Sequence, residues 1–597
     1  MTPTCNNTDY KCSAARWVFP IAIFITLILF DVIWCSTTTF APFSFTELYG
    51  SAIVIAMLLS LPGLVRGMWK TETVIMLLLD ILLVVNLMYS RSYYTSIPLS
   101  SYGLAANLAD FTSSVTDSLR WIDILFPVTT IAAIWLFLTL RHRVQSHANN
   151  LRIALIVSVV GLLLLFAPMA WRGGFINSYN NLRQKAYLCS ATTPVYSVFG
   201  DLAFDYLSTS ATLSPENRVY IESWLDSRPQ FHIPADSLPS RDNMILILAE
   251  SLESWVIGQT VENQEITPNL NRLIADSTTL YIPRVVTQVK GGRSIDAQLI
   301  MLSGLLPISS GTYSVSYPDN SYPTLLKAMK EVRNTRNTLL TIDKPSTWNQ
   351  GVIALSFGID SIVDYGDFEQ TEMFGTHKRL GDVPFLKQVA DKITRGEIWS
   401  NREDGENVCL QIVTYSGHAP FILPEKLREV NFSARIPQKM ADYMATARYT
   451  DKAIGQFIDY LRTLPQYDNT MIVIAGDHEG LADHRTELVN SPGGRGIVSP
   501  EWLTPVIVVN SPVGGRVDKT VGQIDIYPTL LGLLGLGDYE WKGLGQSALD
   551  PSHPGVAVNS LLQPCGAVDS TATVERLKDA YNVSDLIIAH DYFRTRQ

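Results

Sequence analysis

The stretch 290–296, Lys-Gly-Gly-Arg-Ser-Ile-Asp, combines one hydroxyl side chain with two glycines and two cations. An apolar run, 297–306, follows it and predicts a helix that begins near Ser294. Free backbone N–H groups at a helix N-terminus attract anions, and the glycines permit backbone conformations that other residues avoid. A serine in this position can act as a nucleophile toward phosphorus or sulfur when a neighbour activates it. The same stretch also fits an ordinary turn, so its meaning depends on the rest of the chain.

Short, continuous apolar runs in the second half of the chain are typical of strands buried on both faces of a sheet. They occupy residues 243–249, 407–414, 470–475 and 505–509. Helical patterns separate them, at residues 267–277, 324–332 and 438–463. Strands that alternate with helices predict an α/β domain whose mainly parallel sheet is covered by helices on both sides.

Polar residues follow the ends of these predicted strands: Glu250, His418, Asp477 and His478. Ligands of open α/β sheets bind at the carboxyl ends of the strands. Each residue also has a purely structural interpretation, as a helix cap, a surface loop or a turn. Their coincidence at one edge of one sheet favours a shared site.

Two carboxylates, an imidazole and the Ser294 hydroxyl would form an oxygen-rich site for one divalent cation. The predicted ligands are Glu250, Ser294, Asp477 and His478, and the predicted ion is Mn²⁺ in preference to Mg²⁺ or Zn²⁺. Such a cation would lower the pKa of the serine hydroxyl and neutralise charge on a transferring phosphoryl group.

Two further side chains have predicted roles toward the substrate. Arg293, or Lys290 beside it, would hold a phosphate. His418 would act as acid or base on an alcohol, because the pKa of histidine lies near neutrality. The chain has no Gly-x-x-x-x-Gly-Lys-[Ser/Thr] loop for a nucleoside triphosphate, so the donor must be activated already. Phospholipid head groups meet that condition.

The first third of the chain has the composition of a membrane domain. Five apolar runs approach the length that spans a bilayer as a helix, at residues 17–35, 52–65, 73–89, 122–140 and 153–168. Asp31 and Asp80 lie inside two of them, and each has either a functional role or a structural place, near a helix end or in the bundle interior. Basic residues alternate between the connecting loops so that the N-terminus is predicted inside the cell and everything after residue 171 outside.

The net charge of −10 argues against nucleic acid as a partner. The six cysteines show no metal-binding spacing. Cys189 and Cys565 would be able to pair in an oxidising exterior, although free thiols are an equal alternative.

These motifs together resemble the alkaline phosphatase and sulfatase superfamily, and within it the lipoteichoic acid synthase type. The segments that carry the resemblance are 245–251, ending in Glu250, the Gly-Arg-Ser-Ile-Asp of 292–296, the Ser-x-His-x-Pro-Phe of 416–421, the Gly-Asp-His of 476–478 and the closing segment 521–534. The resemblance implies a metal-binding set at Glu250, Ser294, Asp477 and His478 and a substrate-facing role for His418. The Cys/Ser-x-Pro-x-Arg pattern of true sulfatases is absent after Ser294, which argues against sulfate ester hydrolysis.

The chain departs from the family pattern at the expected substrate pocket. The nucleophile is serine where the family usually has threonine. The family segment Phe-Trp-Asn-Arg appears here as Thr347-Trp348-Asn349-Gln350, and Thr341 replaces a histidine. The arginine that holds the head group is therefore missing. Lys344 is predicted to compensate, and Trp348 is predicted either to stack in the pocket or to pack in the core.

The sequence thus predicts five membrane helices (1–171), a connector with amphipathic helices (172–240), an extracytoplasmic sulfatase-like domain (241–550) and a C-terminal extension (551–597) in a bacterial cell membrane. The predicted activity moves a phosphoglycerol-type group from a phospholipid to a glycan, lipid or polymer acceptor through a phospho-Ser294 intermediate. The alternatives are a phosphoethanolamine transferase, a phosphodiesterase, an inactive membrane scaffold and a transporter.

Overall fold

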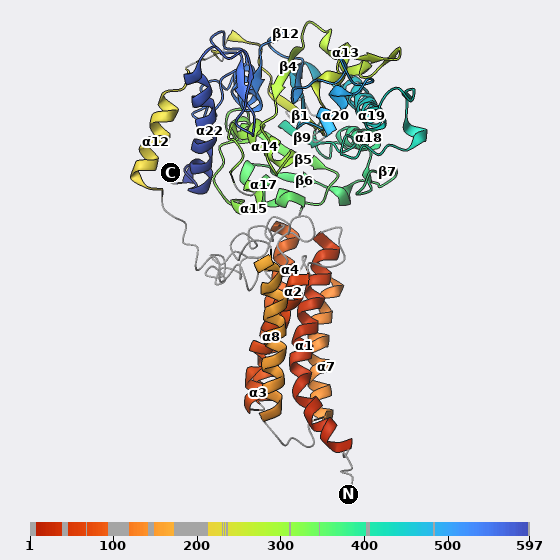
Figure 1. The fold of residues 1–597 in the computed structure, drawn as a ribbon, viewed down its shortest axis with the longest axis vertical. Coiled ribbons are helices and arrows are strands. Elements are labelled where there is room, and N and C mark those ends of the chain that lie inside the picture. Colours follow the sequence, from red (N-terminus) through yellow and green to blue (C-terminus); the bar gives the residue numbers. More distant parts are fainter. Residues whose placement is uncertain are drawn as a thin grey trace. The chain divides into compact units, whose positions relative to one another are not determined.

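The structure, a computed structural model, describes most of the chain. The described residues are 7–38, 46–66, 68–93, 119–140, 148–171 and 213–594, the last range without 230, 232, 235–236, 310–311, 346, 401–405 and 482–483. The chain divides into two compact units, one formed by Met1–Ala211 with Pro345–Val352 and the other by Thr212–Lys344 and Ile353–Gln597 (Figure 1).

The N-terminal unit is helical, and every predicted apolar run lies on its helices. These are α1 (Asn7–Thr38), α2 (Thr46–Leu59), α3 (Leu61–Arg66), α4 (Trp69–Tyr93), α7 (Leu125–Leu140), preceded by the 3₁₀ turn η2 (Trp121–Ile124), and α8 (Ala148–Trp171). Three stretches of the described residues are long and apolar enough to cross a membrane: Ala15–Ser36, Trp69–Met88 and Trp121–Leu140. The other two predicted spans coincide with shorter apolar stretches, Tyr49–Leu59 and Arg152–Leu164.

The carboxylates inside the predicted spans point into the helical bundle. Asp31 and Asp80 are 3% and 5% exposed. The Thr130 hydroxyl of α7 donates a hydrogen bond of 2.6 Å to Asp80 Oδ2 of α4. Of the two interpretations left open for these residues, the structure supports the position in the bundle interior.

The second unit is built on one mixed sheet. Its strands are β1 (Asn243–Ala249), β4 (Leu280–Val286), β5 (Thr335–Thr341), β6 (Ser361–Val363), β9 (Asn407–Val413), β10 (Thr470–Gly476), β11 (Leu503–Val509), β12 (Gly515–Arg516) and β13 (Val521–Gly522). Among the described residues the order is β12-β4-β11-β10-β1-β9-β5-β6, with β13 beside β4. The run from β10 to β6 is parallel, whereas β11 is antiparallel to both its neighbours. All four predicted strands are confirmed, and the sheet is mainly parallel as predicted.

Helices cover both faces of this sheet. On one face, α13 (Pro268–Ile274), α18 (Asp382–Thr394) and α19 (Gln438–Leu461) share a buried core with Ile245, Ile247 and their neighbours on β9 and β10. On the other face, Gln411 of β9 donates a 2.8 Å hydrogen bond to Gln298 of α14 (Ser294–Ser303). Helices α16 (Leu325–Arg333) and α21 (Ile526–Leu533) pack against α14.

Two helices at the ends of this unit lie side by side, α12 (Pro215–Asp226) and α22 (Thr571–Ala589) (Figure 1). The Tyr220 hydroxyl donates a 2.5 Å hydrogen bond to Asp579, and the Arg576 guanidinium lies 4.4 Å from the centre of the Trp224 ring. The predicted connector and C-terminal extension therefore contribute to one packed body. Residues 172–212, including Cys189, lie outside the described residues, so the pairing of Cys189 with Cys565 and the domain boundaries stay predictions.

Candidate active site

The carboxyl edge of the sheet brings distant parts of the chain together. Strands β1 and β10 are parallel neighbours with Ala249 opposite Gly476, so Glu250 and Asp477 leave the sheet side by side. Strand β9, on the other side of β1, leads to the loop that carries His418. Strand β4 is antiparallel to β11, which is itself antiparallel to β10. Hence β4 also ends at this edge, and it leads to the loop before Ser294.

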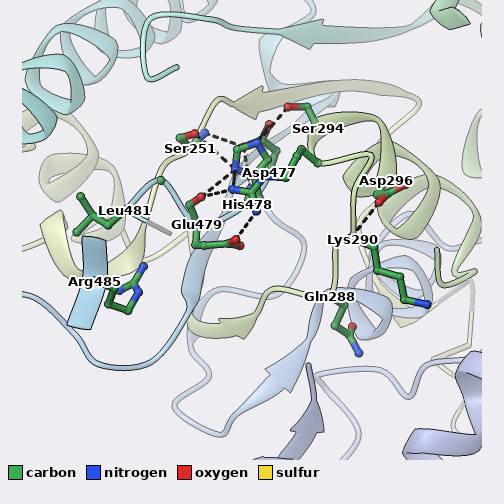
Figure 2. A network of polar contacts seen from close by, with 12 residues as sticks. Ser251, Gln288, Lys290, Ser294, Asp296, Asp477, His478, Glu479, Leu481 and Arg485 are labelled. Carbon is green, nitrogen blue, oxygen red and sulfur yellow. Dashed lines mark hydrogen bonds and ion pairs between the residues drawn. The ribbon is translucent and has the colours of Figure 1, made fainter. Parts of the chain in front are cut away.

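Ser294 is the first residue of α14, as predicted. Its hydroxyl donates a 3.0 Å hydrogen bond to Glu250 Oε2 and lies 3.2 Å from His478 Nε2 (Figure 2). Arg293, just before the helix, has φ 52° and ψ −116°, a conformation that residues with a side chain rarely adopt. The backbone therefore turns sharply enough to present the serine hydroxyl to two predicted metal ligands at once.

The residues Glu250, Asp477 and His478 fit a divalent cation. Their ligand atoms lie within 4.8 Å of one another, and all three side chains are buried. Asp477 Oδ1 accepts hydrogen bonds of 2.7 and 2.8 Å from the backbone N–H groups of Ser251 and His478, whereas Oδ2 is buried with no hydrogen-bond partner. Burial, followed by the negative charge of Asp477, raises the pKa of Glu250. A cation would satisfy the orphaned oxygen and offset the paired negative charges.

The backbone beyond His478 orients its imidazole. His478 Nδ1 lies 3.0 Å from the carbonyl oxygen of Glu479, an arrangement typical of metal-binding histidines, which leaves Nε2 facing Ser294. The Arg293 guanidinium pairs with the Glu479 carboxylate and donates a 2.6 Å hydrogen bond to the same carbonyl oxygen. Arg293, predicted to hold a phosphate, thus also stabilises the backbone that orients His478. Glu479 was not among the predicted site residues, although it directly follows the Gly-Asp-His motif.

Two buried carboxylates hold the loops of the site. Asp296 Oδ2 accepts hydrogen bonds of 2.9 and 3.0 Å from the N–H groups of Lys290 and Gly292, and burial raises its pKa to about 6. Glu253 accepts hydrogen bonds from two backbone N–H groups of the loop after Glu479, and it forms a 2.5 Å ion pair with Arg485. The Lys290 ammonium donates to the carbonyl oxygens of residues 307 and 308, so it supports the chain rather than the site.

His418 lies in an aromatic and basic cluster beside β9. The ring of Tyr415 stacks on it at 5.1 Å, and the ring of His377 approaches it edge-on at 5.7 Å. Its loop is packed against the metal site: a Cβ added at Gly417 would lie 2.0 Å from the Glu250 carbonyl oxygen. His418 Nδ1 is 2.7 Å from the Ala419 carbonyl oxygen, which directs Nε2 away from the backbone.

The two remaining predicted substrate residues follow β5. Lys344 is half-buried, and burial lowers its pKa while Asp364 opposes this shift. Trp348 is half-buried in a 3₁₀ turn, with φ 55° and ψ 19°. The substrate roles of both residues stay predictions.

Comparison with known proteins agrees with this geometry. Residues 242–536 match the family model described as sulfatase, and residues 10–178 match the one described as lipoteichoic acid synthase N-terminal domain. The chain belongs to the lipoteichoic acid synthase type of the sulfatase superfamily. This membership confirms the predicted class of enzyme, a sulfatase-superfamily phosphotransferase.

Individual relatives are distant in sequence. Lipoteichoic acid synthase of Staphylococcus aureus (strain USA300) is 22% identical over 493 residues, which cover 80% of this chain and 74% of that protein. The crystal structure of lipoteichoic acid synthase LtaP from Listeria monocytogenes aligns with a TM-score of 0.50 and 17% identity, covering 64% of this chain and 98% of that one. Streptococcus pyogenes phosphoglycerol transferase GacH, in complex with sn-glycerol-1-phosphate, aligns with a TM-score of 0.41 and 15% identity, covering 64% and 94%.

Proposed function

We propose that this protein transfers a phosphoglycerol-type group from a phospholipid to an acceptor outside the cytoplasm, through a covalent phospho-Ser294 intermediate. The observation that carries the proposal is the Ser294 hydroxyl at the start of α14, within 3.0 Å of Glu250 Oε2 and 3.2 Å of His478 Nε2. A nucleophile so close to buried metal-binding side chains has the activation that phosphoryl transfer requires.

The proposed chemistry divides between a cation and the chain's own groups. Glu250, Asp477 and His478 would hold the ion, with Ser294 as a fourth ligand, and Mn²⁺ or Mg²⁺ suits the excess of oxygen donors better than Zn²⁺. The bound ion would lower the pKa of the hydroxyl and neutralise charge on the phosphoryl oxygens. The Ser294 hydroxyl loses its proton and Oγ attacks the phosphorus, the P–O bond to diacylglycerol breaks, and the oxygen of the leaving lipid takes a proton.

The second half of the reaction regenerates the serine. The acceptor hydroxyl loses its proton and attacks the phosphorus, the P–O bond to Ser294 breaks, and Ser294 Oγ takes a proton. His418, half-buried in its aromatic cluster with Nε2 directed away from the backbone, is the proposed acid and base for these proton transfers. The acceptor class is a glycan, a lipid or a growing polymer, and water in its place would make the enzyme a phosphodiesterase.

The experiment follows a fluorescent phosphatidylglycerol in the purified full-length protein, with mass spectrometry of the trapped peptide. We expect the wild type to release diacylglycerol and to carry the added mass on Ser294. Ser294→Ala should lose turnover by several orders of magnitude while keeping its fold, because only one oxygen is removed. Ser294→Thr should keep part of the activity. Near-native turnover in the Ala variant, or an adduct on another residue, would exclude this mechanism.

A further inference from the structure

Ser251, the residue after Glu250, lies among the predicted metal ligands and takes no part in the proposed proton and phosphoryl transfers. It is only 3% exposed. Its backbone N–H donates a 2.7 Å hydrogen bond to Asp477 Oδ1 (Figure 2). Its hydroxyl donates a 2.9 Å hydrogen bond to Glu250 Oε1 and lies 3.5 Å from His478 Nδ1. This one residue therefore contacts all three of the clustered ligands.

The backbone of Ser251 is held in a conformation that serine rarely adopts. Its φ is 56°, in the left-handed region that favours glycine. The Tyr443 hydroxyl of α19 donates a 2.8 Å hydrogen bond to the Ser251 carbonyl oxygen and accepts one of 2.9 Å from the Glu253 N–H. Tyr443 is itself buried, and its ring stacks on that of Trp255 at 5.3 Å. The surrounding core therefore fixes the conformation in which the N–H and the hydroxyl of Ser251 both reach the ligands.

The loop after β10 leaves Ser251 little room to move. A Cβ added at Gly480 would lie 3.0 Å from the Ser251 carbonyl oxygen and 3.2 Å from the Ser251 Cβ. The Gly480 N–H is itself held by a 2.8 Å hydrogen bond to Glu253 Oε1. Because the two loops are in such close contact, the position of the Ser251 side chain is set by the packing of the site.

The contacts of Ser251 give the two oxygens of each carboxylate ligand different partners. On Glu250, Oε1 accepts from the Ser251 hydroxyl and Oε2 accepts from the Ser294 hydroxyl. On Asp477, Oδ1 accepts from the Ser251 N–H, whereas Oδ2 is buried and has no hydrogen-bond partner among the described residues. A carboxylate with one oxygen held by a hydrogen bond keeps the other oxygen in a fixed direction. The orientation of Glu250 toward Ser294 therefore depends on the Ser251 hydroxyl.

We propose that Ser251 is a positioning residue for the metal-binding set, and that its hydroxyl orients Glu250 so that one carboxylate serves both the cation and the nucleophile Ser294. The inference rests on the proposed function and adds to it a side chain that acts through Glu250 rather than on the substrate. It follows that loss of the Ser251 hydroxyl weakens metal binding while the fold remains.

The test titrates Mn²⁺ into the full-length protein after a chelator has removed bound metal, and it follows the free ion by electron paramagnetic resonance. Ser251→Ala removes the hydroxyl and keeps the N–H that binds Asp477. We expect its Kd for Mn²⁺ to rise about 10- to 100-fold, the usual effect of losing a group that orients a metal ligand. Half-maximal turnover of phosphatidylglycerol should require a correspondingly higher concentration of Mn²⁺.

Two further variants separate the hydroxyl from the backbone and from the packing. Ser251→Gly also lacks the hydroxyl but adopts a positive φ without strain. It should therefore match Ser251→Ala in its affinity for Mn²⁺ and unfold at a higher temperature than Ser251→Ala. Ser303→Ala removes another buried serine hydroxyl, which donates a 2.7 Å hydrogen bond to the Leu299 carbonyl oxygen within α14, and it should keep the wild-type affinity.

Wild-type affinity for Mn²⁺ in Ser251→Gly would overturn the inference, because the backbone conformation and not the hydroxyl would then set the site. Unchanged affinity in Ser251→Ala would overturn it as well, as would an equal loss of affinity in Ser303→Ala. A wild type that binds Mn²⁺, and loses affinity in both Ser251 variants, but turns over no phospholipid would support the inference and remove the proposed function itself.

Discussion

At the scale of single residues, the two carboxylate oxygens of Asp477 have different roles. Oδ1 accepts hydrogen bonds from backbone N–H groups of the loops around the site, while Oδ2 is buried and has no hydrogen-bond partner. The aspartate therefore anchors the backbone with one oxygen and is available to a cation with the other.

Asp477→Asn tests this division, since the amide keeps an oxygen for the loop but removes the charge. We expect the variant to fold and its metal content to fall at least tenfold after dialysis, by elemental analysis of the full-length protein. Asp459→Asn, in an exposed pair with Arg272, serves as the control and should keep the wild-type content. Unchanged occupancy in Asp477→Asn would mean that the ligand assignment is wrong.

Residue types and positions were enough to predict that four side chains share one site: Glu250, Asp477 and His478 follow strands, and Ser294 begins a helix. The sequence did not reveal the ion pair of Asp343 with Arg379, because the strand before Asp343, Thr-Arg-Asn-Thr-Leu-Leu-Thr, begins with four polar residues and lacks the continuous apolar run used to find strands. Arg379 could not be found either, since only the fold brings it to Asp343, where its Nε lies 2.5 Å from Oδ1.

At the scale of elements, the loop before α14 depends on one of its two glycines. A Cβ at Gly292 would lie 2.3 Å from Asp296 Oδ1, whereas a Cβ at Gly291 would meet nothing within 4 Å. The Asp296 carboxylate accepts a hydrogen bond from the backbone N–H of Gly292. A side chain at position 292 would displace this carboxylate.

We therefore expect Gly292→Ala to lower the free energy of unfolding by about 1–3 kcal/mol and to reduce lipid turnover, because the turn that presents Ser294 is displaced. Gly291→Ala is the matched control and should behave nearly as the wild type. Thermal unfolding and the turnover assay measure the two effects. Equal behaviour of the two variants would show that Asp296 does not set the shape of this loop.

The buried pair of Glu253 and Arg485 supports the other side of the site. Removal of one partner leaves a buried charge uncompensated, which costs about 3–5 kcal/mol. Arg485→Met should therefore lower the unfolding temperature markedly. Arg516→Met removes an arginine that is 56% exposed and paired with Asp518, and it should change stability by less than about 1 kcal/mol. Similar losses in both variants would contradict a special role for the buried pair.

The continuous apolar runs in the sequence were enough to locate β1, β9, β10 and β11. They did not show that β11 runs antiparallel to its neighbours. A strand buried on both faces gives the same apolar run whether its neighbours are parallel or antiparallel. The short strands β6, β12 and β13 carry two or three residues each, too few for a period to be read.

At the scale of the whole molecule, the predicted orientation decides which lipids the enzyme meets. A phosphatase reporter that works only outside the cytoplasm, fused after residue 240, should be active, because an odd number of spans precedes it. The same reporter fused after residue 145, in the basic loop predicted inside the cell, should be inactive. An active reporter at 145, or an inactive one at 240, would contradict the five-span topology and the lipid donor with it.

The contact between α12 and α22 places the first and last helices of the catalytic unit beside each other, joined by Tyr220 and Asp579. A body whose two ends meet can be inserted into another chain or circularly permuted with little disturbance of its core. The phosphotransferase unit therefore has the geometry of an exchangeable cassette, whose first and last helices lie side by side.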